Sequence, residues 1–179
     1  MFFHPFSLWL MGPTSAGKTT IAYALVAYLK TIRYPVLHLD GDEVRNLFGN
    51  DLGFSNEERL RVVKACLYML KKARSSNISA VVSALTATEE ARQLLNEQEP
   101  KIIVGHIDCP IEICAQRDPK GLYNKAKNQE IDTLIGYNSA YKAPKNPDFI
   151  IDTMHTSVDE AVKIIMQYLS SVTTWRENS

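Results

Sequence analysis

Residues 12–19 of the sequence read GPTSAGKT and constrain the fold more than any other segment of the chain. They fit the pattern G-x-x-x-x-G-K-[ST], in which the glycines let a loop curl until successive backbone N–H groups point inward at phosphate oxygens. Residues 6–11 before this loop are apolar and predict a buried strand, and residues 19–32 after it carry apolar side chains at helical spacing. The order of strand, glycine loop and helix predicts a phosphate-binding site at a helix N-terminus.

The residues of this loop, called the P-loop below, have distinct chemical tasks. Gly12 and Gly17 supply backbone conformations that a Cβ atom would oppose. Lys18 places a positive charge at the β- and γ-phosphates of a nucleotide, and Thr19 offers a hydroxyl to Mg²⁺. A chance glycine-rich turn is the alternative, which the flanking strand and helix disfavour. The predicted nucleotide contacts in this segment are Gly12, Thr14, Ser15, Ala16, Gly17, Lys18, Thr19 and Thr20.

Strands and helices alternate along the rest of the chain. Apolar segments predict further strands at residues 35–39, 79–83, 102–108 and 149–151. Helical periodicity predicts further helices at residues 55–75, 88–95, 110–117 and 158–169. We therefore expect an α/β fold with a five-stranded parallel sheet flanked by helices. Ligands of such sheets bind at the carboxyl ends of the strands, where the sequence places Gly12, Asp40, Ser83 and Asp108.

The length and one aperiodic stretch predict the domain organisation. The 179 residues suit a single domain, residues 1–179, and 45% of them are hydrophobic, which is enough for a sizeable core. Residues 118–147 show little periodicity and contain the breakers DPKG and APKNP. A stretch of this kind is either a functional lid or a disordered segment.

The composition disfavours several kinds of partner. Lys+Arg and Asp+Glu number 20 each, so we expect no nucleic-acid partner, and any phosphate binding must be local. Residues 1–11 lack a basic region and a small-residue cleavage site, and no other apolar run approaches ~18 residues, so we expect no signal peptide and no membrane partner. Cys66, Cys109 and Cys114 show no metal-binding spacing, which predicts free thiols and a cytoplasmic location. Trp9 is expected in the core.

A second polar segment, HLDGD at residues 38–42, ends the second predicted strand. Phosphoryl transfer needs a group that orients or deprotonates the nucleophile and acids that hold the metal. Asp40 and Asp42 are therefore candidates for these tasks. The alternative is a solvated turn in which Asp42 caps the following helix.

Three residues near this segment are candidates for binding an acceptor. Arg45 lies three residues after Asp42, on the same helix face. Residues 55–58 form a capping box, so Arg59 falls in the first turn of a helix, where its charge opposes the helix dipole and favours an anionic ligand. A surface ion pair is the alternative for Arg59. Phe54, which precedes the cap, is either a hydrophobic staple or a base-stacking platform.

Longer motifs connect the chain to a known family. They are LDGDEVR at residues 39–45, DLGFSNEER at 51–59, IDCPIEICAQRDPKGLYNKA at 107–126 and APKNPDFIIDT at 143–153. With the P-loop, they resemble the adenylylsulfate (APS) kinase family over about residues 6–169. The resemblance implies a P-loop kinase fold with a mobile lid, ATP and Mg²⁺ as cofactors, and a homodimer. It implies phosphorylation of the 3′-hydroxyl of adenylyl sulfate in sulfate assimilation, with ADP as the second product.

The resemblance also implies roles for individual residues. Lys18 is implied to be catalytic, Asp42 to be the catalytic base, and Thr19 and Asp40 to hold the metal. Arg117 is implied to lie beside ATP. The residues implied to bind the acceptor are Asp42, Arg45, Phe54 by stacking, Arg59, Thr86, Lys120 and Leu134. Residues 118–123 match the start of the lid, whose Lys120 and Lys125 are expected to close over phosphates.

Departures from the family pattern cluster on the acceptor side. Val62 stands where the family has an Asn, Ala87 where it has a Ser, and Glu90 where it has an Arg. Leu134 stands where a lid Phe covers the second face of the adenine. Losing one stacking face weakens the grip on a base by roughly 1–3 kcal/mol, and losing a buried polar contact changes discrimination between substrates.

These departures leave more than one function open. Either the positions tolerate drift, or the acceptor is a different nucleotide anhydride such as cytidine diphosphoramidate. A smaller base and a less anionic tail suit Leu134 and Glu90 better than adenylyl sulfate does. A catalytically inactive nucleotide-binding module is a third interpretation, which the intact P-loop and the two acids disfavour.

Overall fold

Five parallel strands form the sheet at the centre of the computed structural model, which describes residues 5–49 and 52–174. The strands are β1 (Ser7–Met11), β2 (Val36–Asp40), β3 (Ser79–Ser83), β4 (Ile103–Asp108) and β5 (Phe149–Asp152). Their order across the sheet is β2-β3-β1-β4-β5, and every neighbouring pair is parallel. The five carboxyl ends therefore meet at one edge. The predicted five-stranded parallel sheet is confirmed.

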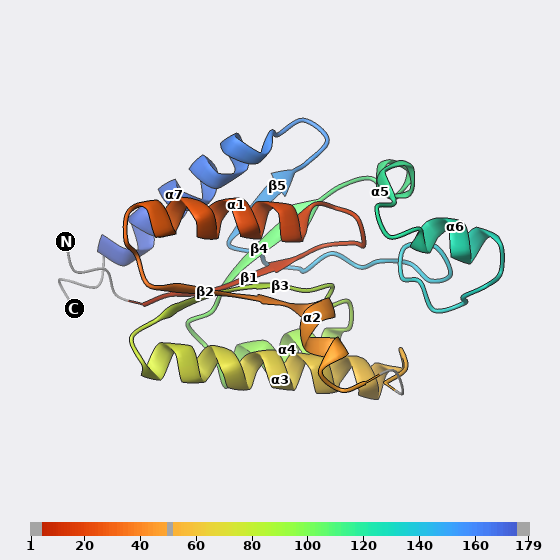
Figure 1. The fold of residues 1–179 in the computed structure, drawn as a ribbon, viewed down its shortest axis with the longest axis horizontal. Coiled ribbons are helices and arrows are strands. Elements are labelled where there is room, and N and C mark those ends of the chain that lie inside the picture. Colours follow the sequence, from red (N-terminus) through yellow and green to blue (C-terminus); the bar gives the residue numbers. More distant parts are fainter. Residues whose placement is uncertain (1–4, 50–51, 175–179) are drawn as a thin grey trace.

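Helices cover both faces of this sheet (Figure 1). α1 (Lys18–Thr31) and α7 (Val158–Thr174) lie on one face, and α3 (Asn56–Ser75) and α4 (Glu89–Gln98) lie on the other. Three shorter helices, α2 (Gly41–Asn46), α5 (Ile111–Arg117) and α6 (Leu122–Lys127), lie towards the carboxyl edge of the sheet. This arrangement is the α/β fold that the alternation of segments predicts.

The two helical layers pack on opposite sides of β1, whose alternate side chains point to opposite faces. Leu8 and Leu10 belong to the cluster that packs against α1 and α7. Trp9 and Met11 belong to the cluster that packs against α3 and α4. All four side chains are buried, as expected for a central strand of a parallel sheet, and Trp9 is fully buried as the sequence predicts.

Local hydrogen bonds fix where the helices begin. At α3 the Ser55 hydroxyl accepts from the Glu58 amide at 3.3 Å, and the Glu58 carboxylate accepts from the Ser55 amide at 3.0 Å, which confirms the capping box. At α2 the alternative interpretation was wrong, because the capping carboxylate is that of Asp40 and not that of Asp42. One Asp40 oxygen accepts from the Asp42 amide at 2.8 Å and from the Glu43 amide at 3.4 Å. The last residue of β2 thus starts α2 with no loop between them.

Residues 118–147 contain one helix that the sequence analysis does not predict, α6. Its N-cap is Gly121, whose φ is +67°, and the Asp118 carboxylate accepts from the amides of Tyr123 and Asn124 at 3.1 and 3.0 Å. Only two of its six residues, Tyr123 and Ala126, are buried, so the helix is too short to show a period in the sequence. The Tyr123 hydroxyl donates to the Thr14 carbonyl at 3.2 Å, which joins this segment to the P-loop.

Two further expectations concern thiols and membranes. Cys66, Cys109 and Cys114 are free, as the sequence predicts, and all three are buried. Within residues 5–49 and 52–174, the helices include none that combines the length and the apolar character needed to cross a membrane.

The capping box should make a measurable contribution to stability. Ser55→Ala removes the acceptor of the Glu58 amide and should lower the free energy of unfolding by about 1 kcal/mol, measured by urea denaturation. Ser75→Ala is the matched control on the same helix, because the Ser75 hydroxyl donates to the Lys72 carbonyl at an exposed position. We expect that control to change stability by less than about 0.5 kcal/mol. Equal effects of the two substitutions would contradict the role of the capping box.

Candidate active site

The P-loop lies between β1 and α1, at the carboxyl edge of the sheet. Gly12 passes so close to β4 that a Cβ atom there would collide with the Ile107 carbonyl oxygen. Gly17 is the N-cap of α1 and has a φ of +98°, a conformation that side chains oppose. Both glycines are therefore required by the path of the loop, which presents the N-terminus of α1 to the site.

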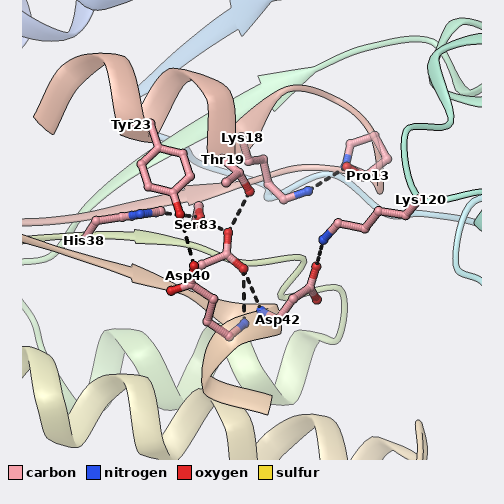
Figure 2. Close-up of polar contacts among 10 residues, drawn as sticks. Pro13, Lys18, Thr19, Tyr23, His38, Asp40, Asp42, Ser83 and Lys120 are labelled. Carbon is pink, nitrogen blue, oxygen red and sulfur yellow. Dashed lines mark hydrogen bonds and ion pairs between the residues drawn. The ribbon is translucent and has the colours of Figure 1, made fainter. Parts of the chain in front are cut away.

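Lys18 is folded back onto its own loop. Its ammonium donates to the Pro13 carbonyl at 2.7 Å (Figure 2). Burial lowers the pKa of Lys18 to about 8, although the carboxylates of Asp42 and Asp40 favour its charged form. The side chain thus carries a charge that is incompletely stabilised where the sequence predicts phosphates.

Asp40 is the centre of the polar network in Figure 2. One carboxylate oxygen accepts from the Thr19 hydroxyl at 2.7 Å and from the Ser83 hydroxyl at 2.9 Å, while the other caps α2. His38 Nε2 lies 2.9 Å from the Ser83 hydroxyl, whose proton goes to Asp40, so His38 acts as the donor. Burial alone would raise the pKa of Asp40, but these hydrogen bonds together lower it. Asp40 is therefore held as a carboxylate.

The donor set here fits a magnesium ion. A carboxylate from Asp40 and a hydroxyl from Thr19 are hard oxygen ligands, and Mg²⁺ in nucleotide sites takes most of its other ligands from phosphates and water. Among the residues that the structure describes, no group of three or more His, Cys, Asp or Glu side chains forms a closed metal cage. The residues present thus suit a metal that arrives with a nucleotide.

Asp42 and Lys120 form an ion pair across the site. The Lys120 ammonium lies 2.5 Å from an Asp42 carboxylate oxygen, although the two residues are 78 positions apart in the sequence (Figure 2). Burial opposes the charge on Lys120, but the contact with Asp42 raises the pKa of this lysine overall. The predicted catalytic base and the predicted lid lysine are thus in direct contact.

Arg45, Phe54 and Arg59 form a cation–aromatic cluster on one wall. The Phe54 ring is 51% exposed, and the guanidinium carbons of Arg45 and Arg59 lie 4.5 and 5.4 Å from its centroid. A hydrophobic staple would need an apolar residue at the fourth position of α3, and Arg59 stands there. Phe54 therefore makes a cation–π contact with Arg59 in place of an apolar staple. About half of the Phe54 surface remains exposed beside the two guanidinium groups.

The guanidinium of Arg59 bonds to backbone carbonyls. It donates to Phe54 at 2.8 Å and to Thr133 at 2.9 Å. Within the described ranges, no carboxylate lies at ion-pair distance from Arg45 or Arg59. Burial lowers the pKa of both arginines, and the charge of Arg45 lowers that of Arg59 further. Binding of an anionic ligand would offset the energetic cost of burying these two guanidinium charges.

One cavity of about 590 Å³ brings these residues together. The predicted site residues that line it are Thr14, Ser15, Gly17, Lys18, Thr19, Thr20, Asp40, Asp42, Arg45, Phe54, Arg59, Thr86, Arg117, Lys120 and Leu134. Gly12 and Ala16 do not line it, since Gly12 packs on β4 and Ala16 is fully buried. Lys125 is exposed and also lies outside the lining.

The cavity extends past residues that the sequence analysis does not identify. Thr153, Thr156 and Val158 line it directly after β5. Arg117 donates to the Thr153 hydroxyl at 3.1 Å and to the Thr153 carbonyl at 2.6 Å, and the same hydroxyl donates to the Ala16 carbonyl at 2.9 Å. Ligands bind at the carboxyl ends of parallel strands, and the fifth predicted strand has such an end. The sequence analysis placed site residues at the carboxyl ends of the other four strands only.

Comparisons with known proteins agree with this geometry. A family model described as adenylylsulphate kinase matches residues 4–152. The probable adenylyl-sulfate kinase of Pyrococcus abyssi is 35% identical over 162 residues, covering 90% of this chain and 93% of the relative. That of Archaeoglobus fulgidus is 38% identical over 148 residues, covering 83% and 96%. Among solved structures, the Mycobacterium tuberculosis APS kinase CysC in complex with AMPPNP and APS matches with a TM-score of 0.89 and 28% identity, covering 94% of this chain and 99% of that one.

The low pKa of Lys18 predicts that the affinity for ATP depends on pH. Because that pKa is about 8, the ammonium is mostly charged at pH 7 and mostly neutral at pH 9.5. The dissociation constant of MgATP, measured by calorimetry at constant ionic strength, should rise roughly tenfold or more over this range. Lys18→Arg keeps its charge throughout and should show little change over the same range. A wild-type constant that is flat with pH would contradict this role of Lys18.

Proposed function

Because the chain belongs to the adenylylsulfate kinase family, we propose that it transfers the γ-phosphoryl group of ATP to the 3′-hydroxyl of adenylyl sulfate. The observation that carries this proposal is the single cavity that the P-loop, the acidic pair Asp40 and Asp42, and the Arg45–Phe54–Arg59 cluster all line. A phosphate donor, a base and an acceptor site are the parts that phosphoryl transfer to a nucleotide requires.

On the donor side, the chain's own groups bind the phosphates of ATP. Lys18 leaves the Pro13 carbonyl and moves its charge onto the phosphates, while the backbone N–H groups of the P-loop cradle them. Arg117 and the residues after β5 line the part of the cavity beyond the P-loop and bind the nucleoside of ATP. Thr19 and Asp40 would hold Mg²⁺, which would neutralise charge on the transferring phosphoryl group.

Asp42 acts as the base on the acceptor. Its carboxylate takes the proton of the 3′-hydroxyl as the 3′-oxygen bonds to the γ-phosphorus and the bond to the leaving oxygen of ADP breaks. For this step Lys120 must leave Asp42, because its ammonium and the 3′-hydroxyl of the acceptor compete for the same carboxylate. The freed ammonium is then near the phosphates that it is proposed to contact.

Arg45, Phe54 and Arg59 hold the acceptor. Both guanidiniums line the cavity, and burial disfavours their positive charge, which suits the phosphate–sulfate anhydride of adenylyl sulfate. The half-exposed Phe54 ring stacks on the base, a contact worth roughly 1–3 kcal/mol in nucleic-acid complexes.

A different acceptor is the second candidate, and one observation favours it. Val62 and Leu134 are both buried in the cavity wall and present only carbon atoms, where the family pattern has an amide and an aromatic ring. A nucleotide anhydride with a smaller base, such as cytidine diphosphoramidate, would lose less from these replacements. Glu90 is exposed and outside the lining, so its charge does not bear on this choice.

Four further properties belong to the proposal. We propose one kinase domain over residues 1–179, with residues 118–147 as a lid that opens and closes. In support of the lid, Lys120 contacts Asp42 and Tyr123 contacts the P-loop. We propose a cytoplasmic location, supported by three buried free thiols. The homodimer rests on the family resemblance alone, and light scattering of the purified protein tests it.

The first test is ADP release from MgATP with adenylyl sulfate as acceptor. We expect turnover in the range of ordinary enzymes, ~1–10³ s⁻¹. Negligible turnover while MgATP still binds would reject adenylyl sulfate as the acceptor, and cytidine diphosphoramidate would then be assayed. If no acceptor gives ADP, the chain is a nucleotide-binding module without catalysis.

Asp42→Asn tests the base. The substitution should lower kcat by about 100-fold or more, because an amide accepts no proton, while the dissociation constant of MgATP changes by less than about threefold. Asp159→Asn is the matched control, since Asp159 is exposed in the first turn of α7 and lies outside the cavity lining. Turnover by Asp42→Asn at the wild-type rate would overturn the assignment.

A further inference from the structure

Thr86 has a strained backbone in the wall of the cavity. Its φ is +44°, a left-handed conformation that is costly for a β-branched residue. Thr86 is buried, and it lies between Leu85 and Ala87, which also line the cavity. A conformation of this kind persists only where surrounding contacts hold it, so those contacts decide the shape of the wall.

Two buried side chains from different elements hold Thr86. The Trp9 indole N–H of β1 donates to the Thr86 hydroxyl at 2.8 Å. The Arg92 guanidinium of α4 donates through Nε to the Thr86 carbonyl at 3.0 Å. Trp9 is fully buried, and Arg92 is only 8% exposed. Thr86 is thus fixed through both its side chain and its backbone.

Arg92 also holds the far end of the segment 118–147. Its two terminal nitrogens donate to the carbonyls of Lys142 and Ala143, the latter at 3.1 Å. The neighbouring Tyr141 ring stacks on His106 of β4, with ring centroids 6.0 Å apart. One guanidinium therefore bonds to three backbone carbonyls, and it links the cavity wall to the proposed lid.

A buried cation in this position has little compensation from acids. The Glu89 carboxylate lies 4.0 Å from Arg92, and its side chain is 63% exposed. Most of the hydrogen bonding that stabilises the guanidinium comes instead from the three carbonyls. Losing the cation would leave these carbonyls without their donor, and both segments would be free to shift.

We propose that Arg92 is a positioning residue for the acceptor site. By holding Thr86 and residues 142–143 together, it fixes the wall formed by residues 85–87 and anchors the segment that carries Thr133 and Leu134. Arg59 also holds that segment, through the Thr133 carbonyl. This inference rests on the proposed function, in which that half of the cavity binds the acceptor.

The position of Arg92 separates acceptor binding from ATP binding. Its hydrogen bonds and its ion pair go to Thr86, Lys142, Ala143 and Glu89, and none of these residues is in the P-loop or follows β5. Removing the guanidinium should therefore act on the acceptor and spare the nucleotide. A purely structural role would weaken both.

Steady-state kinetics of Arg92→Ala and Arg92→Lys test the proposal. Arg92→Ala should raise the KM for adenylyl sulfate roughly tenfold or more, with the KM for ATP changed by less than about twofold. Arg92→Lys should recover only part of the loss, because an ammonium lacks the fork that reaches three carbonyls. Equal rises in both KM values, or no rise in either, would overturn the proposal.

Lys145→Ala is the matched control. Lys145 pairs with Glu89 at 3.0 Å and so joins the start of α4 to the same segment, but at an exposed position and without contact to Thr86. Its kinetics should stay at the wild-type values. A rise in acceptor KM as large as that of Arg92→Ala would show that any link between the two elements has this effect, and would overturn the specific role of Arg92.

Amide hydrogen exchange provides a readout that is independent of the acceptor. With MgATP alone, Arg92→Ala should lose protection in residues 84–88 and 131–145, while the P-loop and α1 keep theirs. If the wild type shows this protection but no turnover with adenylyl sulfate, the proposed acceptor fails and the positioning contact stands. Unchanged exchange in Arg92→Ala would refute the contact, whatever the acceptor.

Discussion

The carboxylate of Asp40 is the interaction on which the rest of the site depends. It ends β2, caps α2, and accepts hydrogen bonds from Thr19 of α1 and Ser83 of β3. Four elements, two of which are distant in the sequence from the β2–α2 junction, are thus joined at one buried anion. Because the cap leaves no loop between β2 and α2, Asp42 and Arg45 are fixed relative to the P-loop by the first turns of a helix. A neutral residue at position 40 would loosen the proposed base and the proposed metal ligands together.

Much of this architecture follows from local patterns in the sequence. The strand at residues 79–83 matches β3 at both ends, and the P-loop, the capping box and the parallel sheet are as predicted. These features depend on neighbouring residues, which a sequence displays directly. The alternative interpretation gave the cap of α2 to Asp42, which was wrong, because both acids fit the pattern and only the turn of the backbone decides which carboxylate faces the amides.

The features that the sequence did not predict are contacts between residues far apart in the chain and one short helix. Lys120 and Asp42 meet across 78 positions, and Arg92 reaches carbonyls that are 50 and 51 positions away. No periodicity encodes such contacts, because they arise from how elements pack. α6 escaped for the opposite reason, since two buried residues in six produce no detectable period. Thr86 was expected to contact the acceptor, but nothing in its local sequence indicates that the Trp9 indole donates a hydrogen bond to its hydroxyl.

The pairing of Asp42 with Lys120 has a consequence for how ATP is spent. The Lys120 ammonium lies 2.5 Å from an Asp42 carboxylate oxygen and so occupies a position at which a water molecule or a hydroxyl group would donate to that oxygen. Under the proposed mechanism, Asp42 is then not available to activate a water molecule beside bound ATP. Only a ligand with enough negative charge to draw the lysine away would release the base. The ion pair thus keeps the proposed base occupied until the acceptor binds.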